Sequence, residues 1–207
     1  MGTALSHIHR FEPGKEKGGP AILLLHGTGG DENDLIGLGR AVAPDAALLS
    51  ARGRVLENGA PRFFRRLAEG VFDEVDLRRR AGELADFIGE ARQVYGIDAP
   101  VALGFSNGAN IAAAVLLLHP EALAGGALLR ALVPLQQPPS ADLTGKPVLI
   151  LSGSMDPIIP PENATRLAAI LRERGSSVDH RTLPAGHGLT QADVGIVQDW
   201  MTQLRAA

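Results

Sequence analysis

The sequence predicts an α/β fold, an open and mostly parallel sheet with helices on both faces. Two observations carry this prediction. Short apolar runs bounded by glycine or proline alternate with longer segments of helical periodicity, and several of the runs are apolar throughout, as strands buried on both faces of a sheet are. The apolar runs cover residues 21–25, 46–50, 101–105, 126–133 and 147–152. Alternation of this kind is typical of parallel sheets, whose ligands bind at the carboxyl ends of the strands.

The remaining elements follow in chain order. Two further strands are predicted, a first edge strand over residues 6–11 and a last, more polar strand over residues 178–183. Helices are predicted over residues 33–42, 77–95, 109–118, 162–174 and 194–204. The helix of residues 77–95 is amphipathic and has the length of a crossover between parallel strands. We find no internal repeat and no linker, so we expect a single domain that spans residues 1–207.

Composition excludes several classes of protein. The 207 residues are 45% apolar, enough for one sizeable core, and the formal net charge of −3 argues against a nucleic-acid partner. The absence of cysteine excludes disulfides, thiolate metal sites and a cysteine nucleophile. The longest apolar run, residues 111–118, is far shorter than the ~18 residues of a membrane span. With no signal-peptide pattern among the first 20 residues, we expect a soluble intracellular protein.

The connection over residues 51–76 is unusually long for a compact domain, and such connections are usually functional or carry a small element of their own. It contains three of the six phenylalanines of the chain. Together with two later apolar residues they are candidates for the wall of a substrate pocket: Phe63, Phe64, Phe72, Met155 and Ile158. The alternative is that the connection is a surface flap whose phenylalanines cover the core.

Ser106 is the candidate nucleophile. It lies in the motif Gly104-x-Ser106-x-Gly108, between the predicted strand of residues 101–105 and the predicted helix that follows. A serine at such a sharp turn is pushed out of the sheet and lies at a helix N-terminus, where free N–H groups favour developing negative charge. The motif alone also fits a small-residue turn that only lets the helix pack on the strand.

A glycine-rich loop follows the first buried strand. Its sequence is His26-Gly-Thr-Gly-Gly-Asp31. So many glycines after a buried strand suggest that backbone N–H groups line a shared space, as in an oxyanion or phosphate cradle. The alternative is an ordinary turn from strand to helix.

A serine hydroxyl needs a base and a group that orients the base. Of six histidines we choose His187, because it follows the last strand, is flanked by glycines and precedes the final helix. Asp156 lies in the exit loop of an earlier buried strand, and the order Ser106, Asp156, His187 is that of a triad on an α/β-hydrolase sheet. The other carboxylates considered as the orienting acid are Asp142, Asp179 and Asp193.

These residues predict the hydrolysis of an ester. His187 accepts the proton of Ser106 as the hydroxyl attacks the carbonyl, and Asp156 orients the imidazole. The oxyanion is expected to bind two backbone N–H groups, those of Thr28 and Asn107. Water then hydrolyses the acyl-enzyme.

With these motifs in place, the chain resembles the phospholipase/carboxylesterase family of α/β hydrolases, close to the branch of hydroquinone-responsive hydrolases and related to acyl-protein thioesterases. The resemblance extends over nearly the whole chain and rests on the segments His26–Leu35, Arg62–Arg66, Gly104–Asn110, Asp156–Pro160 and Gly186–Thr190. It implies the same triad and oxyanion residues, no cofactor and no metal, a cytoplasmic location, and a homodimer, since members are often dimeric.

Three positions depart from the pattern of the resembled family. Where proline, methionine and proline are expected, this chain has Ala51, Ala60 and Ala131. All three lie in or near segments expected to border the pocket, so they bear on substrate preference.

The leading hypothesis is a serine carboxylesterase that acts on a small-molecule ester with a small to medium acyl group, because the chain has room for only a minimal cap. The alternative within the enzyme class is a lysophospholipase or acyl thioesterase. A non-catalytic ligand receptor on the same fold is the alternative from another class, and an incomplete triad would favour it. No H-E-x-x-H or comparable spacing of metal ligands occurs.

Overall fold

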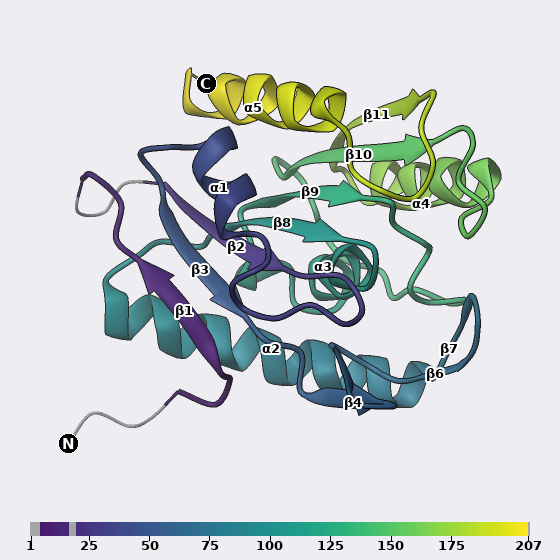
Figure 1. Cartoon of the computed structure of the whole chain (residues 1–207), viewed down its shortest axis with the longest axis horizontal. Coiled ribbons are helices and arrows are strands. Elements are labelled where there is room, and N and C mark those ends of the chain that lie inside the picture. Colours follow the sequence, from purple (N-terminus) through teal and green to yellow (C-terminus); the bar gives the residue numbers. More distant parts are fainter. Residues whose placement is uncertain (1–4, 17–19, 207) are drawn as a thin grey trace.

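The computed structural model describes residues 5–16 and 20–206. Seven strands form the central sheet: β1 (His9–Glu12), β2 (Ala21–Leu25), β3 (Ala47–Ala51), β8 (Val101–Phe105), β9 (Gly125–Leu129), β10 (Pro147–Gly153) and β11 (Ser177–Leu183). Their order across the sheet is β1-β3-β2-β8-β9-β10-β11 (Figure 1). Only β1 is antiparallel to its neighbour, and every other pair is parallel. The predicted open, mostly parallel sheet is therefore confirmed.

Helices cover both faces of this sheet. On one face lie α1 (Ile36–Val42) and α5 (Gln191–Ala206), and on the other α2 (Glu74–Tyr95), α3 (Asn107–Leu118) and α4 (Pro161–Glu173) (Figure 1). A short 3-10 turn, η1 (Pro120–Ala122), follows α3. No helix in the described part of the chain is long and apolar enough to cross a bilayer.

Strand β2 shows why the core has two halves. Because successive side chains of a strand point to opposite faces, Leu23 and Leu25 pack in the core under α2, α3 and α4, whereas Ile22 and Leu24 pack in the core under α1 and α5. All five residues of the strand are buried. The continuous apolar run in the sequence is thus explained by burial on both faces.

The long connection after β3 folds into two small β-hairpins. They are formed by β4 (Val55–Glu57) with β5 (Ala60–Arg62), and by β6 (Arg66–Ala68) with β7 (Val71–Phe72). These hairpins, which precede α2, are the minimal cap of the fold. Their position beyond the carboxyl ends of the central strands brings residues 61–72 to the functional site.

Strand β9 is shorter than predicted. The apolar pattern predicts a strand over residues 126–133, but β9 ends at Leu129, because Arg130 adopts a left-handed backbone conformation with φ of 57°. The Arg130 N–H still donates to the carbonyl of Leu151 at 2.8 Å. The chain then leaves the sheet and the Arg130 side chain enters the site described next.

Candidate active site

Ser106 occupies a strained turn between β8 and α3. Its φ of 53° and ψ of −113° are rare for a residue with a side chain and cost free energy. The flanking glycines are required by close packing. A Cβ at Gly104 would lie 2.6 Å from the carbonyl oxygen of Gly108, and a Cβ at Gly108 would lie 2.0 Å from that of Leu25. The small residues of the motif therefore let α3 press against the sheet while Ser106 projects from it.

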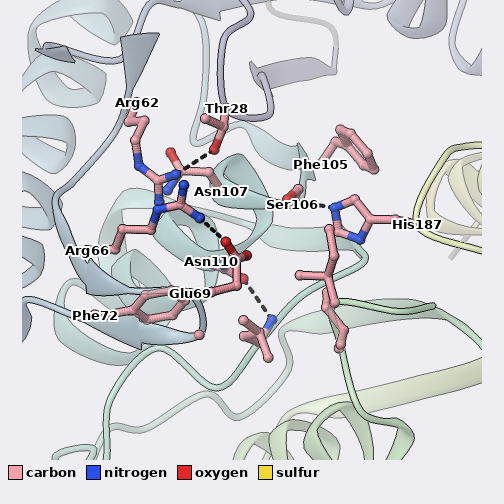
Figure 2. A pocket seen from close by; sticks show the side chains of 14 residues that line it. Thr28, Arg62, Arg66, Glu69, Phe72, Phe105, Ser106, Asn107, Asn110 and His187 are labelled. Carbon is pink, nitrogen blue, oxygen red and sulfur yellow. Dashed lines mark hydrogen bonds and ion pairs between the residues drawn. The ribbon is translucent and has the colours of Figure 1, made fainter. Parts of the chain in front are cut away.

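Ser106, His187 and Asp156 form a continuous chain of hydrogen bonds. The Asp156 side chain is buried, and its Oδ2 lies 2.8 Å from His187 Nδ1. Since an ionised carboxylate only accepts hydrogen bonds, Nδ1 carries the proton and Nε2 is free to accept. Nε2 lies 2.9 Å from Ser106 Oγ, which donates to it (Figure 2). The three side chains come from the ends of three different strands, β8, β10 and β11.

The Asp156 carboxylate is itself fixed by the backbone. Its Oδ1 accepts the N–H groups of Ile158 at 2.8 Å and Ile159 at 3.1 Å. The two oxygens thus have separate tasks, since one orients the loop and the other orients the imidazole. This leaves the carboxylate with one position relative to His187.

Arg130 binds the backbone of the loop that carries His187. The fully buried guanidinium donates from Nε to the carbonyl of Gly186 at 3.0 Å and from Nη2 to that of Gly188 at 3.3 Å, the residues on either side of His187. Its charge is balanced by Asp193, whose two oxygens accept from Nη1 at 2.8 Å and Nη2 at 3.0 Å.

Asp193 is therefore not an orienting acid for His187. It lies in the first turn of α5 and accepts the N–H and hydroxyl of Thr190, each at 2.8 Å, besides the two bonds from Arg130. Burial alone would raise the pKa of Asp193, but the hydrogen bonds from Arg130 and Thr190 outweigh it and leave the pKa below its usual value. The carboxylate stays ionised at neutral pH.

Two backbone N–H groups beside Ser106 have no acceptor among the described residues. They belong to Thr28, in the glycine-rich loop after β2, and Asn107, the first residue of α3. The N–H groups of a first helical turn have no partner within the helix. Both groups are those predicted as oxyanion donors, and they remain available for a ligand.

Residues 61–63 hold these two donors in place from the side. The carbonyl of Pro61 accepts the Gly29 N–H at 2.9 Å, and Arg62 Nη1 donates to Thr28 Oγ1 at 2.8 Å. The Phe63 N–H donates to Asn107 Oδ1 at 2.7 Å. One short segment of the cap thus contacts both sides of the predicted oxyanion site.

His26 has a structural role at the base of the glycine-rich loop. The side chain is 1% exposed, its Nδ1 donates to the carbonyl of Gly27 at 2.6 Å, and its Nε2 accepts the N–H of Gly53 at 3.0 Å. Burial lowers its pKa, so the imidazole stays neutral as this pattern requires. It ties the glycine-rich loop to the start of the cap.

A second Ser–His contact lies elsewhere, at the edge of the sheet. Ser152 Oγ is 3.0 Å from His180 Nε2 and 3.1 Å from Thr182 Oγ1. No carboxylate in the described part of the chain forms a hydrogen bond with His180, and Ser152 is buried within β10. This pair lacks an orienting acid and has no access to a ligand.

A cavity of about 300 Å³ opens beside Ser106. Figure 2 shows Ser106, Phe105 and His187 along one side of it and Arg62, Arg66 and Phe72 along the other. Ile158, Ile159 and Leu132 contribute apolar surface, and Asn107 and Asn110 of α3 contribute amides. The lining of the cavity is therefore mixed, with apolar side chains beside arginines and amides.

Of the predicted pocket residues, Phe72 and Ile158 line this cavity and three others do not. Phe63 and Phe64 are buried in the core, with the ring of Phe63 against His26 and that of Phe64 edge-on to Phe72. The side chain of Met155 is mostly exposed outside the cavity. The Phe63 N–H donates to Asn107 Oδ1, so at this point the backbone contacts the site while the rings of Phe63 and Phe64 pack in the core.

The three alanines that depart from the resembled pattern also lie outside the cavity lining. Ala51 and Ala131 are fully buried, and Ala60 is half-buried in β5. None of the three alanines therefore contacts the cavity directly, as the expected effect on substrate preference would require.

Four charged side chains of the cap form one cluster at the cavity. Glu57 pairs with Arg62 at 3.0 Å and with Arg66 at 2.9 Å, and Arg66 also pairs with Glu69. Burial lowers the pKa of Arg62, an effect that Glu57 opposes. Among the described residues, no group of three or more His, Asp or Glu side chains is arranged to hold a metal ion.

Sequence reasoning missed Arg62, Arg66, Asn110 and Arg130 as residues of the site. Arg130 did carry a signal, because a charged residue in the middle of an apolar run is almost never fully buried without a partner. Arg62 and Arg66 are two of the three arginines within residues 62–66, and the pattern does not distinguish those that face inward. Asn110 is followed by eight apolar residues of α3, and a polar residue before such a run is a weaker signal of the same kind.

The chain is similar to known proteins over nearly its whole length. The family model described as phospholipase/carboxylesterase matches residues 7–204. MhqD of Bacillus subtilis (strain 168), a protein named as a hydrolase, is 45% identical over 194 residues, which are 93% of this chain and 96% of that protein.

Solved structures of similar proteins share the architecture. The Bacillus cereus carboxylesterase has a TM-score of 0.93 and 44% identity, covering 96% of this chain and 94% of that one. The structure of YahD with malic acid has a TM-score of 0.90 and 28% identity, covering 95% and 98%.

Proposed function

Because the chain belongs to the phospholipase/carboxylesterase family of α/β hydrolases, we propose that it is a serine carboxylesterase that hydrolyses small to medium carboxylic esters through an acyl-enzyme on Ser106. The observation that carries the proposal is the hydrogen-bonded chain from Asp156 through His187 to Ser106 at the edge of a cavity. A hydroxyl paired in this way with an oriented imidazole is the usual arrangement of an activated nucleophile.

The first half of the reaction forms the acyl-enzyme. Ser106 Oγ attacks the ester carbonyl while its proton passes to His187 Nε2, and Asp156 stabilises the imidazolium through Nδ1–H. The carbonyl oxygen becomes an oxyanion that accepts hydrogen bonds from the N–H groups of Thr28 and Asn107. His187 then gives its proton to the departing alcohol oxygen as the C–O bond breaks.

The second half releases the acid. A water molecule gives a proton to His187 Nε2 and attacks the acyl carbonyl, and the same two N–H groups hold the second oxyanion. Collapse of this intermediate breaks the bond to Ser106 Oγ, which takes the proton back from His187. Each turnover consumes one ester and one water and yields one alcohol and one acid.

Substrate size follows from the cavity. Ligand pockets usually span about 300 to 1,000 Å³, so a cavity of about 300 Å³ suits short esters rather than long acyl chains. This disfavours the lysophospholipase alternative. The complete chain of three side chains disfavours a non-catalytic receptor. The malic acid found with YahD is a small dicarboxylic acid, of a size similar to the short esters proposed as substrates here.

The experiment is hydrolysis of p-nitrophenyl esters from acetate to palmitate by the wild type and by Ser106→Ala. We expect turnover that peaks at short chains and disappears in the variant. A peak at long chains would favour the lysophospholipase, and a matched thioester series would reveal an acyl thioesterase. If the wild type hydrolyses no ester and no thioester, the non-catalytic ligand receptor is the remaining function.

A further inference from the structure

One wall of the cavity presents hydrogen-bond donors with no acceptors of their own. The amide orientation of two asparagines on α3 is fixed by the backbone, because Asn107 Oδ1 accepts the Phe63 N–H and Asn110 Oδ1 accepts the Leu132 N–H, both at 2.7 Å. The NH₂ end of each amide is therefore the end left for another partner. Asn107 Nδ2 is buried and has no acceptor among the described residues.

A buried donor that lacks an acceptor costs free energy, and such groups are rare in native proteins. Asn107 is 2% exposed and Asn110 is 4% exposed, and both line the cavity. An unsatisfied amide at this place is explained if a ligand supplies the missing acceptor.

The arginines extend this donor surface. Arg62 and Arg66 line the same cavity, and the Arg62 side chain is only 4% exposed. Arg62 uses Nε and Nη1 for Phe64 and Thr28, and Arg66 uses the same two atoms for Glu57 and Glu69. No acceptor among the described residues bonds to Nη2 of either arginine. A planar guanidinium with free donors favours a carboxylate or a similar planar anion.

Among the residues that the structure describes, one acidic side chain lines the cavity, that of Glu69 in the turn between β6 and β7. It is 65% exposed and pairs with Arg66 alone. An exposed ion pair of this kind contributes little, so Glu69 can give way to another carboxylate at Arg66. Glu57, in contrast, is shared by both arginines and stays in place.

We propose that the cavity takes esters that carry a second, free carboxylate, which binds the donors of Arg62, Arg66, Asn107 and Asn110 and displaces Glu69 from Arg66. This inference rests on the proposed carboxylesterase function and names its substrate class, the half-esters of short dicarboxylic acids. The size of the cavity agrees, since about 300 Å³ suits a short half-ester, and Ser106 lies on one side of the cavity and the arginines on the other (Figure 2).

The test compares half-esters with neutral esters of matched length. The substrates are monoethyl succinate and monoethyl glutarate against ethyl butyrate and ethyl valerate, with acid release followed by pH-stat. The readout is the ratio of kcat/KM for half-ester to kcat/KM for neutral ester. The variants are Arg66→Gln, which removes a charge in the cavity, and Arg65→Gln, which removes the same charge from an exposed side chain that pairs with Asp73 outside the cavity.

We expect the ratio to fall by about tenfold in Arg66→Gln, the usual effect of losing a hydrogen bond to a charged group, and to stay within about twofold of wild type in Arg65→Gln. Glu69→Gln should raise the ratio severalfold, because Arg66 loses its internal competitor. Inhibition of neutral-ester hydrolysis by free succinate should weaken by a similar factor in Arg66→Gln.

The same ratio in wild type, Arg66→Gln and Arg65→Gln, with unchanged inhibition by succinate, would overturn the anion subsite and leave the esterase intact. Hydrolysis of neither kind of ester by the wild type would instead overturn the proposed function, and this inference with it.

Discussion

Arg130 and Asp193 form a buried, two-bond ion pair directly beneath the loop that presents His187. The bonds are 2.8 and 3.0 Å long, and neither side chain has appreciable exposure. Because the same guanidinium binds the carbonyls on both sides of His187, the pair sets the position of the imidazole. Arg130 is in this account a positioning residue, since it acts on the proposed base only through the backbone.

Replacing Arg130 by methionine should lower both stability and kcat. Loss of one partner of a buried pair leaves an uncompensated charge and typically costs about 3 to 5 kcal/mol. The double variant Arg130→Met/Asp193→Leu removes that charge and should recover most of the melting temperature. Its kcat should stay low, because the carbonyls of residues 186 and 188 still lack their donor. Recovery of kcat together with stability would show that the pair only stabilises the fold.

Thr28→Val should reduce kcat by about tenfold with little change in KM. The substitution keeps the backbone N–H but removes the hydroxyl that Arg62 binds at 2.8 Å, so the proposed oxyanion donor is less well aligned. Complete loss of one oxyanion donor typically lowers the rate by ~10²–10³. This value is the upper limit for the decrease of kcat in Thr28→Val. Thr202→Val on the exposed face of α5 is the matched control. Equal kcat values for the two variants would contradict the role of the Arg62 contact.

Gly108→Ala should destabilise the protein and abolish most activity. The added Cβ would lie 2.0 Å from the carbonyl oxygen of Leu25, so α3 must move away from the sheet, and overpacking commonly costs about 1 to 3 kcal/mol or more. Gly89→Ala in α2 is the control, because its Cβ would meet nothing within 4 Å. That change should stabilise by up to about 1 kcal/mol. Urea unfolding measures the stability of both variants. A similar change of stability in Gly108→Ala and Gly89→Ala would contradict close packing at Gly108.

Stability should fall as the pH drops from 6.5 to 4. Burial, with a smaller effect of Arg54, lowers the pKa of His7 to about 4, while the unfolded chain keeps the ordinary value of 6.5. Within this window the unfolded state binds a proton that the folded state does not, so the free energy of unfolding decreases by at most about 3 kcal/mol. His7→Leu should reduce this slope in unfolding measurements from pH 7 to pH 4. A slope identical to wild type would contradict the lowered pKa.

The sequence predicted those features that depend on local pattern. The buried strands appear as apolar runs, and Ser106, Asp156 and His187 each follow a strand, where ligands bind in an open parallel sheet. The pattern could not predict what depends on contacts distant in sequence. Arg130 contacts residues 186 to 193 only in the folded chain. The strand ends before Arg130, although the apolar residues around it predict that the strand continues.

The phenylalanines of the cap illustrate the same limit. Their enrichment made residues 51–76 a candidate for the pocket wall, and of the three only Phe72 is among the described residues that line the cavity. Composition gives no direction for a side chain, however, and the neighbouring rings of Phe63 and Phe64 pack in the core while the Phe63 N–H donates to Asn107.

Covalent labelling shows whether Ser106 is the nucleophile. The protein is incubated with a fluorophosphonate, and the adduct is located by peptide mass spectrometry while residual esterase activity is followed. We expect one adduct per chain, on Ser106, formed in step with the loss of activity. The adduct should also form in Ser152→Ala, which removes another serine that lies beside a histidine. Full labelling or full turnover in Ser106→Ala would contradict this role of Ser106.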